Sequence, residues 1–417
     1  MTATIPPITV PGDKSIAHRA LILAALARGT SRLRNVPAGL DVRSTQRALR
    51  ALGASIAEDG DAMVVTGTGG ALATPGEPID CGNSGTTIRL LAGVLATRPV
   101  TVTLDGDASL RARPMRRIAA PLEAFGAQIA LTPYGTAPFV VRGNGDARGA
   151  EVEIVVASAQ VKSAVLFAAL NAHGRTRVTG QLATRDHTER LFRAYGMTCE
   201  ADDGALVVEG PQIPQACDFD VPGDVSSAAF LLAAAAVVPG ARAVVEDVGL
   251  NPTRIAFLDV LRRFGAQVDV TPASFGEEPR GRIAVRGASL RAIVVEPGEV
   301  PGLIDELPLV GVLGAFARGT TVVTGASELR VKESDRIETF ARAARTIGVE
   351  VETFEDGFAV HGPARFRSGS VVTAGDHRIA MAFSVAARAA GIEVRLDDPD
   401  CMAVSFPGFT GALERVA

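Results

Sequence analysis

Residues that could bind anions and transfer protons stand where several apolar segments of this 417-residue chain begin. Lys14, Ser15 and Arg19 open the first such segment, and Ser158 and Gln160 open another. Ser15 and Arg19 are one helical turn apart, so both could face one ligand. A capped helix start with solvated charges explains each group equally well in isolation. Only the convergence of several such groups would indicate a binding site.

Carboxylates occur at two later helix starts. Asp305 directly precedes an apolar helix pattern, where it could cap the helix or act as a general base near bound phosphates. The run from Lys332 through Glu333 to Arg336 is dense in charge and also begins a helix pattern. Lys332 and Arg336 are four residues apart, so the pattern predicts that they share a helix face. A solvated charged surface is the alternative for this run.

Arginine recurs at corresponding points along the chain, each just ahead of a helix pattern: Arg43, Arg113, Arg185, Arg254 and Arg336. Arg378 adds a cation at a further helix start. The planar fork of donors in arginine suits carboxylates and phosphates. The chain has no Cys or His spacing typical of a metal site and no Ser-His-Asp order. These residues predict proton transfer among anionic substrates, stabilised by Arg and Lys, without a metal or cofactor.

Six clusters of small, polar or charged residues each precede an Ala-, Leu- and Val-rich helix pattern, at 11–15, 82–87, 158–160, 222–224, 305–306 and 375–378. A helix N-terminus offers unpaired N–H groups and the positive end of the helix dipole. Several such ends aimed at one place would form an anion-binding cleft.

The clusters mark a repeat of about 60–80 residues, and each repeat has the pattern of a small βαβαββ module. We predict an α/β fold in which three repeats form one domain, 13–222, and three form another, 1–12 plus 223–417. The sixth repeat is cut short, and we expect the extended segment Ile5–Val10 to supply its missing strand. The crossings near 12–14 and 221–224 would form a hinge that allows ligand-driven closure.

Composition excludes several other classes of function. The length suggests about two domains, and the net charge of −4 gives no general attraction to polyanions. With no Trp and two Tyr, the chain lacks a stacking surface for nucleic acid. Four Cys without pairing motifs and an N-terminus unlike a signal peptide predict a cytoplasmic protein. The most apolar stretch, Gly223–Pro239, fits a buried helix better than a membrane span.

Six motifs spread over almost the whole chain resemble those of the 5-enolpyruvylshikimate-3-phosphate synthase family: Pro11-Gly12-Asp13-Lys14-Ser15-x-x-His18-Arg19, Gly82-Asn83-Ser84-Gly85-Thr86-Thr87-x-Arg89, Arg113-Pro114-Met115, Ser158-Ala159-Gln160-x-Lys162-Ser163, Lys332-Glu333-Ser334-Asp335-Arg336 and Asp376-His377-Arg378-x-Ala380-Met381. The resemblance implies transfer of the enolpyruvyl group of phosphoenolpyruvate to the 5-hydroxyl of shikimate 3-phosphate, with release of phosphate. It also implies two domains of inside-out α/β barrel form, with the active site in the cleft between them. The family acts in aromatic amino acid biosynthesis, and a monomer without nucleic-acid or membrane partners is expected.

The resemblance further implies a role for each matched residue. Shikimate 3-phosphate would contact Lys14, Ser15, Arg19, Ser158, Gln160, Arg185, Asp305 and Lys332. Phosphoenolpyruvate would contact Lys14, Gly85, Arg113, Gln160, Arg336 and Arg378. Asp305 would accept the hydroxyl proton, and Glu333 with Lys14 would protonate and then deprotonate the methylene carbon.

Two positions depart from the motifs of some family members. Ala159 stands where those members have a second serine, and Val404 stands where they have a lysine. Each replacement removes one donor for an anionic ligand. Gly85 leaves space beside the expected phosphoenolpyruvate position, which predicts that the herbicide glyphosate can bind there.

Three alternatives compete with this interpretation. UDP-N-acetylglucosamine enolpyruvyl transferase shares the fold but has a reactive cysteine in a loop that corresponds to Leu104–Arg113, where this chain has none. An RNA-end-processing protein of related repeat fold is disfavoured because the chain has no basic stripe and few aromatic residues. A non-catalytic repeat scaffold would leave Asp305 and Glu333 without a role.

Overall fold

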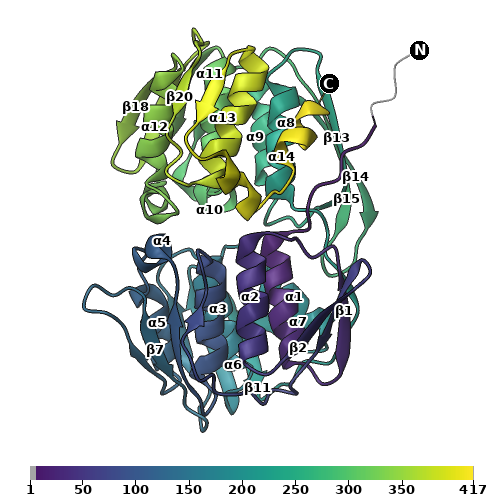
Figure 1. Ribbon diagram of the computed structural model, residues 1–417, viewed down its shortest axis with the longest axis vertical. Helices are drawn as coiled ribbons and strands as arrows, with labels where there is room; N and C mark the ends of the chain where they lie inside the picture. Colours follow the sequence, from purple (N-terminus) through teal and green to yellow (C-terminus); the bar gives the residue numbers. More distant parts are fainter. Residues whose placement is uncertain (1–5, 417) are drawn as a thin grey trace. The chain divides into compact units, whose positions relative to one another are not determined.

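The computed structural model describes residues 6–416 of the chain. These residues form two compact units (Figure 1), which we call the continuous unit, residues 14–221, and the split unit, residues 6–13 with 222–416. Each unit is described by itself.

The continuous unit combines helices with small mixed sheets. Its helices are α1 Lys14–Leu26, α2 Leu40–Ala51, α3 Gly85–Ala96, α4 Ala108–Arg111, α5 Arg116–Glu123, α6 Ala159–Ala169 and α7 His187–Ala194. Its strands are β1 Thr30–Arg34, β2 Ser55–Asp59, β3 Ala62–Thr66, β4 Ile79–Asp80, β5 Thr101–Asp105, β6 Gln128–Ala130, β7 Phe139–Arg142, β8 Glu151–Ile154, β9 Gly174–Gly180, β10 Glu200–Asp202, β11 Ala205–Gly210 and β12 Phe219–Asp220. They pair in the orders β12-β1-β3-β2, β4-β5-β7-β6 and β10-β11-β9-β8.

The split unit repeats this construction. Its α-helices are α8 Val225–Ala236, α9 Ala256–Phe264, α10 Val300–Leu303, α11 Leu307–Phe316, α12 Arg336–Thr346, α13 His377–Ala390 and α14 Phe409–Glu414, and its 3₁₀ helices are η1 Pro297–Glu299, η2 Ser327–Val331 and η3 Pro399–Val404. Its strands are β13 Arg242–Gly249, β14 Gln267–Ser274, β15 Arg280–Arg286, β16 Val294–Val295, β17 Gly319–Val323, β18 Glu350–Phe354, β19 Gly357–Gly362, β20 Gly369–Val371 and β21 Val394–Leu396. They pair in the orders β13-β15-β14, β16-β17-β19-β18 and β20-β21.

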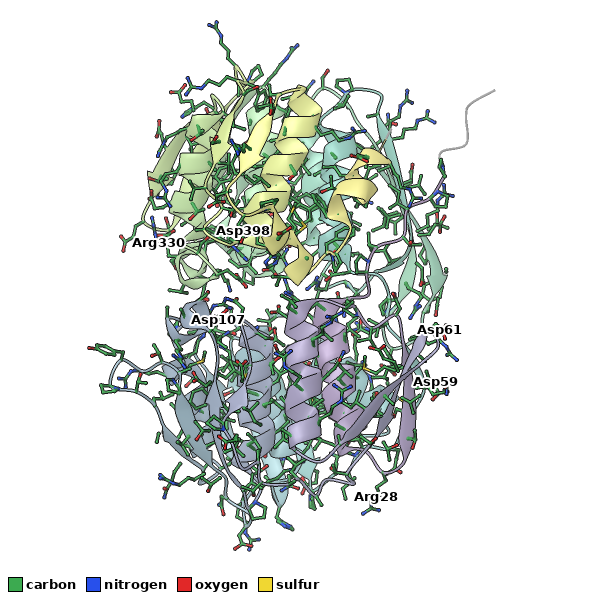
Figure 2. All side chains as sticks on the ribbon, viewed as in Figure 1. Arg28, Asp59, Asp61, Asp107, Arg330 and Asp398 are labelled. Atoms are coloured by element: carbon green, nitrogen blue, oxygen red, sulfur yellow. The ribbon has the colours of Figure 1, made fainter. Side chains whose placement is uncertain are left out.

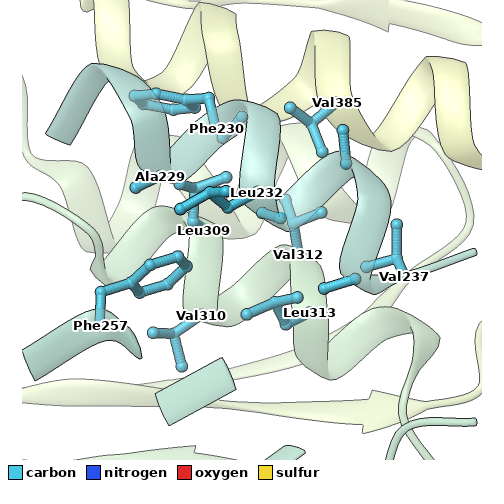
Figure 3. Close-up of a cluster of buried hydrophobic side chains, with 14 of the residues drawn as sticks. Ala229, Phe230, Leu232, Val237, Phe257, Leu309, Val310, Val312, Leu313 and Val385 are labelled. Atoms are coloured by element: carbon cyan, nitrogen blue, oxygen red, sulfur yellow. The ribbon is translucent and has the colours of Figure 1, made fainter. Parts of the chain in front are cut away.

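The helices at the centre of each unit are mostly apolar and largely buried, which is the pattern of a helix packed in a core. In the continuous unit these are α1, α3 and α6, and in the split unit they are α8, α11 and α13. Figure 3 shows part of the second core, where Phe230 and Leu232 of α8 lie near Leu309 of α11 and Val385 of α13. These six helices are the ones that follow the polar clusters, so the core holds the candidate residues in place.

A glycine sets the spacing of two central helices of the continuous unit. A Cβ atom at Gly93 of α3 would lie 2.1 Å from the carbonyl oxygen of Ala164 on α6, far inside van der Waals contact. Only glycine therefore permits this approach, which brings the polar first turns of α3 and α6 together.

The prediction for the N-terminal segment is wrong. Ile8 pairs in parallel with Val245 of β13, in the fourth repeat, and not with the sixth repeat. Ile8 N–H donates to Val244 O at 2.8 Å, and Glu246 N–H donates to Ile8 O at 3.0 Å. In the first repeat, strand β1 has a parallel partner strand, β12. The corresponding strand of the fourth repeat, β13, lies at the edge of its sheet, and Ile8 pairs with that edge. Ile5, also part of the predicted strand, lies outside the described residues.

The mixed α/β fold is confirmed, as is the buried helix inside Gly223–Pro239, since every residue of α8 is buried. The sixth repeat is short, with only the parallel pair β20-β21 among its described residues. Across residues 6–416, no helix has both the length and the apolar character that a membrane span requires.

Candidate active site

In the continuous unit, the first turns of α3 and α6 are joined by the side chain of Gln160. Its Nε2 donates to Thr86 Oγ1 at 2.9 Å, and its Oε1 accepts from Arg89 Nη1 at 2.7 Å. Arg89 is buried and also donates to the carbonyl oxygen of Gly85 at 3.3 Å. Two predicted ligand residues, Gln160 and Gly85, are therefore neighbours held by one guanidinium.

Arg19 fixes the start of α1 against α6 and α7. Its Nη2 donates to Ser163 Oγ at 2.7 Å, its Nε donates to Thr188 Oγ1 at 2.8 Å, and its Nη1 donates to Ser15 O at 2.7 Å. The guanidinium is buried, and these three acceptors are neutral oxygen atoms. They fix Arg19, a predicted ligand residue, against two other helices of the unit.

The loop before α3 carries the predicted phosphoenolpyruvate contacts. Ser84 caps the helix by accepting from Thr87 N–H at 3.1 Å. Arg113 donates to Asn83 Oδ1 and lies 3.3 Å from Ser109 Oγ. A Cβ at Gly85 would lie 2.6 Å from Arg89 Nη1 and 3.1 Å from Arg113 Nη1, so the glycine lets two guanidinium groups meet over the helix start.

The other predicted residues of this unit have simpler surroundings. Lys14 is the first residue of α1, and its Nζ lies 2.7 Å from Asp41 Oδ2. Ser158 caps α6, accepting from Val161 N–H at 3.4 Å. Ser15 is half-buried in the first turn of α1, and Arg185 is half-buried two residues before α7 begins.

In the split unit, Arg336 contacts three carboxylates. Its Nε donates to Asp376 Oδ2 at 2.8 Å, its Nη2 donates to Glu333 Oε2 at 2.5 Å, and its Nη1 lies 3.5 Å from Asp305 Oδ1. Burial opposes the charge on Arg336, but the three carboxylates outweigh it and raise the pKa of the guanidinium. Burial likewise opposes the charge on Asp376, yet Arg336 holds the pKa of that carboxyl below its ordinary value.

Arg378, at the start of α13, also contacts Asp305. Its Nη1 donates to the carbonyl oxygen of Asp305 at 3.1 Å, and its Nε lies 3.5 Å from Asp305 Oδ1. Asp305 therefore lies between two buried arginines, Arg336 and Arg378. The predicted base and both predicted phosphoenolpyruvate arginines of this unit come together.

Surface ion pairs elsewhere in the chain differ from this cluster. Asp59 lies at the end of β2 beside Asp61 (Figure 2), and its carboxylate is 2.9 Å from Arg32 Nη1. Both partners are exposed, and such pairs contribute about 0–1 kcal/mol. A buried cluster can stabilise one charge arrangement far more strongly, because solvent does not screen it.

Two details of the sequence interpretation of the charged helix starts need correction. Lys332 and Arg336 do not share a helix face, because α12 begins only at Arg336 and Lys332 Nζ lies 3.8 Å from Glu328 Oε2. The carboxylates ahead of α11 do not cap it; Glu306 accepts instead from Ser226 Oγ.

The arginine recurrence is also uneven. Arg43 lies within α2 and is exposed, whereas Arg254 is buried and lies 3.2 Å from Asp224 Oδ1 and 3.5 Å from Asp13 Oδ2. An exposed helical position and a buried ion pair are different environments, so these two arginines do not form part of one recurring ligand clamp.

Sequence interpretation gave no role to three residues that the structure places in or behind these clusters: Arg89, Lys162 and Asp376. Arg89 and Lys162 carried a usable signal, since each is a lone cation within an otherwise apolar helix pattern. A charge at such a position is buried and must have partners. Nothing in the sequence names those partners, because they lie on other elements.

Comparisons with known proteins cover nearly the whole chain. Residues 5–413 match the family model described as EPSP synthase (3-phosphoshikimate 1-carboxyvinyltransferase). A protein of Anaeromyxobacter sp. (strain Fw109-5), named 3-phosphoshikimate 1-carboxyvinyltransferase, is 46% identical over 409 residues, which is 98% of this chain and 95% of the relative.

Solved structures agree. EPSP synthase from Acinetobacter baumannii superposes with a TM-score of 0.85 at 38% identity, covering 99% of this chain and 95% of that one. The enolpyruvyl transferase NikO from Streptomyces tendae has a TM-score of 0.79 at 17% identity over 99% of this chain and 94% of that one, a likeness of fold alone. With a family model that spans the sequence and relatives of this identity, the chain belongs to the EPSP synthase (3-phosphoshikimate 1-carboxyvinyltransferase) family.

Proposed function

We propose that this protein transfers the enolpyruvyl group of phosphoenolpyruvate to the 5-hydroxyl of shikimate 3-phosphate and releases phosphate, as a step of aromatic amino acid biosynthesis. Family membership supports the reaction, and the position of Asp305 between Arg336 and Arg378 carries the argument for this chain. A carboxylate at this position can act as a general base, while the two cations beside it attract anionic substrates.

The reaction needs a base, an acid and compensation of charge. Asp305 accepts the proton of the 5-hydroxyl while the hydroxyl oxygen forms a bond to C2 of phosphoenolpyruvate. Glu333 with Lys14 delivers a proton to C3. The tetrahedral intermediate then returns a proton from C3 to Glu333 with Lys14 while the bond from C2 to the phosphate oxygen breaks, which restores the double bond and frees phosphate. Glu333 Oε2 is 2.5 Å from Arg336 Nη2, so the acid and base candidates contact one guanidinium.

The binding roles follow the matched motifs. Shikimate 3-phosphate contacts Lys14, Ser15, Arg19, Ser158, Gln160, Arg185, Asp305 and Lys332 in this proposal, and phosphoenolpyruvate contacts Lys14, Gly85, Arg113, Gln160, Arg336 and Arg378. The buried cation Arg19 and the shared guanidinium of Arg89 support the assignments in the continuous unit. In this proposal, the segments near 12–14 and 221–224 form a hinge that allows ligand-driven closure. We further propose that the protein is a cytoplasmic monomer that binds neither nucleic acid nor membranes.

Phosphate release tests the reaction. We expect the purified protein to release phosphate only when shikimate 3-phosphate and phosphoenolpyruvate are both present. UDP-N-acetylglucosamine in place of shikimate 3-phosphate serves as the control acceptor and should give no release. Release with UDP-N-acetylglucosamine alone as acceptor would overturn the proposal and favour the related transferase.

A further inference from the structure

Lys162 is a buried cation that the proposed reaction does not use. It lies on α6 and is 1% exposed, although the rest of that helix is almost wholly apolar. Its Nζ is 2.6 Å from Oε1 of Glu189, a residue of α7 that is 6% exposed. Removing two charges from water is costly and is offset only by good geometry and further hydrogen bonds. A pair of apolar side chains could pack two helices together, so this ion pair calls for a different explanation.

The remaining hydrogen bonds of Lys162 point to that explanation. Its ammonium donates to the carbonyl oxygens of Leu182 and Thr184, each at 3.4 Å. With Glu189, these give the three N–H donors of the ammonium three acceptors. Leu182 and Thr184 belong to the segment that leads into α7, and Arg185 follows directly. Lys162 therefore holds the backbone from which Arg185 projects.

A second polar link runs beside the first. Ser163 Oγ and Thr188 Oγ1, the neighbours of Lys162 and Glu189, are 2.7 Å apart. Arg19 donates to both hydroxyls, at 2.7 Å to Ser163 and 2.8 Å to Thr188. The α6–α7 contact thus supports Arg19 directly and Arg185 through the backbone, and both are proposed contacts of shikimate 3-phosphate.

We propose that Lys162, paired with Glu189, is a positioning residue for shikimate 3-phosphate: it fixes the 182–185 segment so that Arg185 is held ready for the substrate. This inference rests on the proposed function. It predicts an effect on one substrate only, since the contacts of Lys162 lie on the side of α6 that faces α7, while phosphoenolpyruvate depends on Gln160 and the start of α3.

The test compares Lys162→Met with the double variant Lys162→Met/Glu189→Gln. The single change leaves Glu189 buried without its cation and lowers the melting temperature. The double change removes both charges and restores much of that stability. Both variants should raise the KM for shikimate 3-phosphate about 10- to 100-fold, as misplacement of a binding group does, with the KM for phosphoenolpyruvate within about twofold of wild type. Calorimetry with shikimate 3-phosphate alone should show the same loss of affinity.

Arg98→Met is the matched control. Arg98 is another buried cation of the same unit, near the far end of α3, and it donates to the carbonyl oxygens of Val94 and Gly70. It should lower the melting temperature and leave both KM values unchanged. A double-mutant cycle with Arg185→Ala completes the test: if Lys162 acts through Arg185, the two losses in shikimate 3-phosphate affinity are not additive.

Normal shikimate 3-phosphate affinity in the folded double variant overturns the inference, as does additivity with Arg185→Ala. Neither result affects the proposed function, which stands or fails on phosphate release by the wild-type protein.

Discussion

Asp376 and Arg336 form an ion pair closed to solvent, with Arg336 Nε 2.8 Å from Asp376 Oδ2 and both side chains at most 1% exposed. The same carboxylate caps α13 by accepting from Arg378 N–H at 3.0 Å. One side chain therefore orders both arginines that flank Asp305.

Asp376→Asn should destabilise the protein at neutral pH. Asparagine still caps a helix, so the loss isolates the charge. Breaking one side of a buried pair costs about 3–5 kcal/mol, measured as the free energy of unfolding in urea. The folded-state pKa of Asp376 lies below its unfolded value, so its contribution is present above pH of about 4 and is lost as the pH falls through the folded value. The difference in free energy of unfolding between wild type and variant should therefore be constant from pH 7 to about 5 and decrease at more acidic pH.

Asp59→Asn provides the comparison, because Asp59 pairs with Arg32 at the surface. Its cost should stay below about 1 kcal/mol. An equal cost for the two variants at pH 7 would show that burial gives the Asp376 pair no special weight.

Asp305→Asn should lower kcat far more than it raises either KM. Asparagine keeps the size of the side chain and removes the base, and such proton transfers contribute about 100- to 10,000-fold in rate. Steady-state kinetics with each substrate varied in turn separates the two effects. Asp259→Asn, in an exposed pair with Arg262, is the control and should behave as wild type. An effect confined to KM would remove Asp305 from the base role.

Gly85→Ala should raise the KM for phosphoenolpyruvate about 10- to 100-fold and that for shikimate 3-phosphate by less, since Gly85 is a proposed contact of phosphoenolpyruvate alone. The added Cβ would lie 2.6 Å from Arg89 Nη1, so this guanidinium must move, and Arg113 Nη1 at 3.1 Å is also crowded. Gly76→Ala is the control, because its Cβ meets nothing within 4 Å. We also expect glyphosate to inhibit the wild type in competition with phosphoenolpyruvate and to inhibit Gly85→Ala less. Full wild-type activity at glyphosate concentrations far above the phosphoenolpyruvate KM would contradict this expectation.

Ala159→Ser should lower the KM for shikimate 3-phosphate. Ala159 is the first residue of α6, next to the predicted ligand Ser158, and a hydroxyl there adds a donor for the substrate phosphate. A hydrogen bond to a charged group contributes about 1.5 kcal/mol, or about tenfold in affinity. Direct binding measured by calorimetry checks this, with the exposed Ala71→Ser as control. An unchanged affinity would mean that position 159 does not face the phosphate.

The buried helices were predictable because their sequence pattern is local. The apolar segments after residues 158, 224 and 376 became α6, α8 and α13, and each begins with a side-chain cap as the polar clusters suggested. Where the pattern included charged residues, local spacing was insufficient. Lys332 follows the 3₁₀ helix η2, which ends at Val331, and α12 begins only at Arg336, so the two residues do not belong to one helix.

Partners distant in sequence were not predictable. Ile8 lies 237 positions before Val245, and one extended apolar segment fits the edge of many strands. Lys162 could be recognised as a buried charge, but its partners Glu189, Leu182 and Thr184 depend on how α7 approaches α6. The residues at the helix starts follow from motifs, whereas the residues that support them follow from packing.

The pairing of β12 with β1 joins the two ends of the continuous unit, since β1 begins at Thr30 and β12 ends at Asp220. During synthesis, a growing chain carries β1 long before β12 exists. The first sheet of this unit therefore keeps an unpaired parallel edge until roughly the whole unit has emerged from the ribosome. The sheet of β1 is therefore completed only when β12, at the end of the continuous unit, has been synthesised.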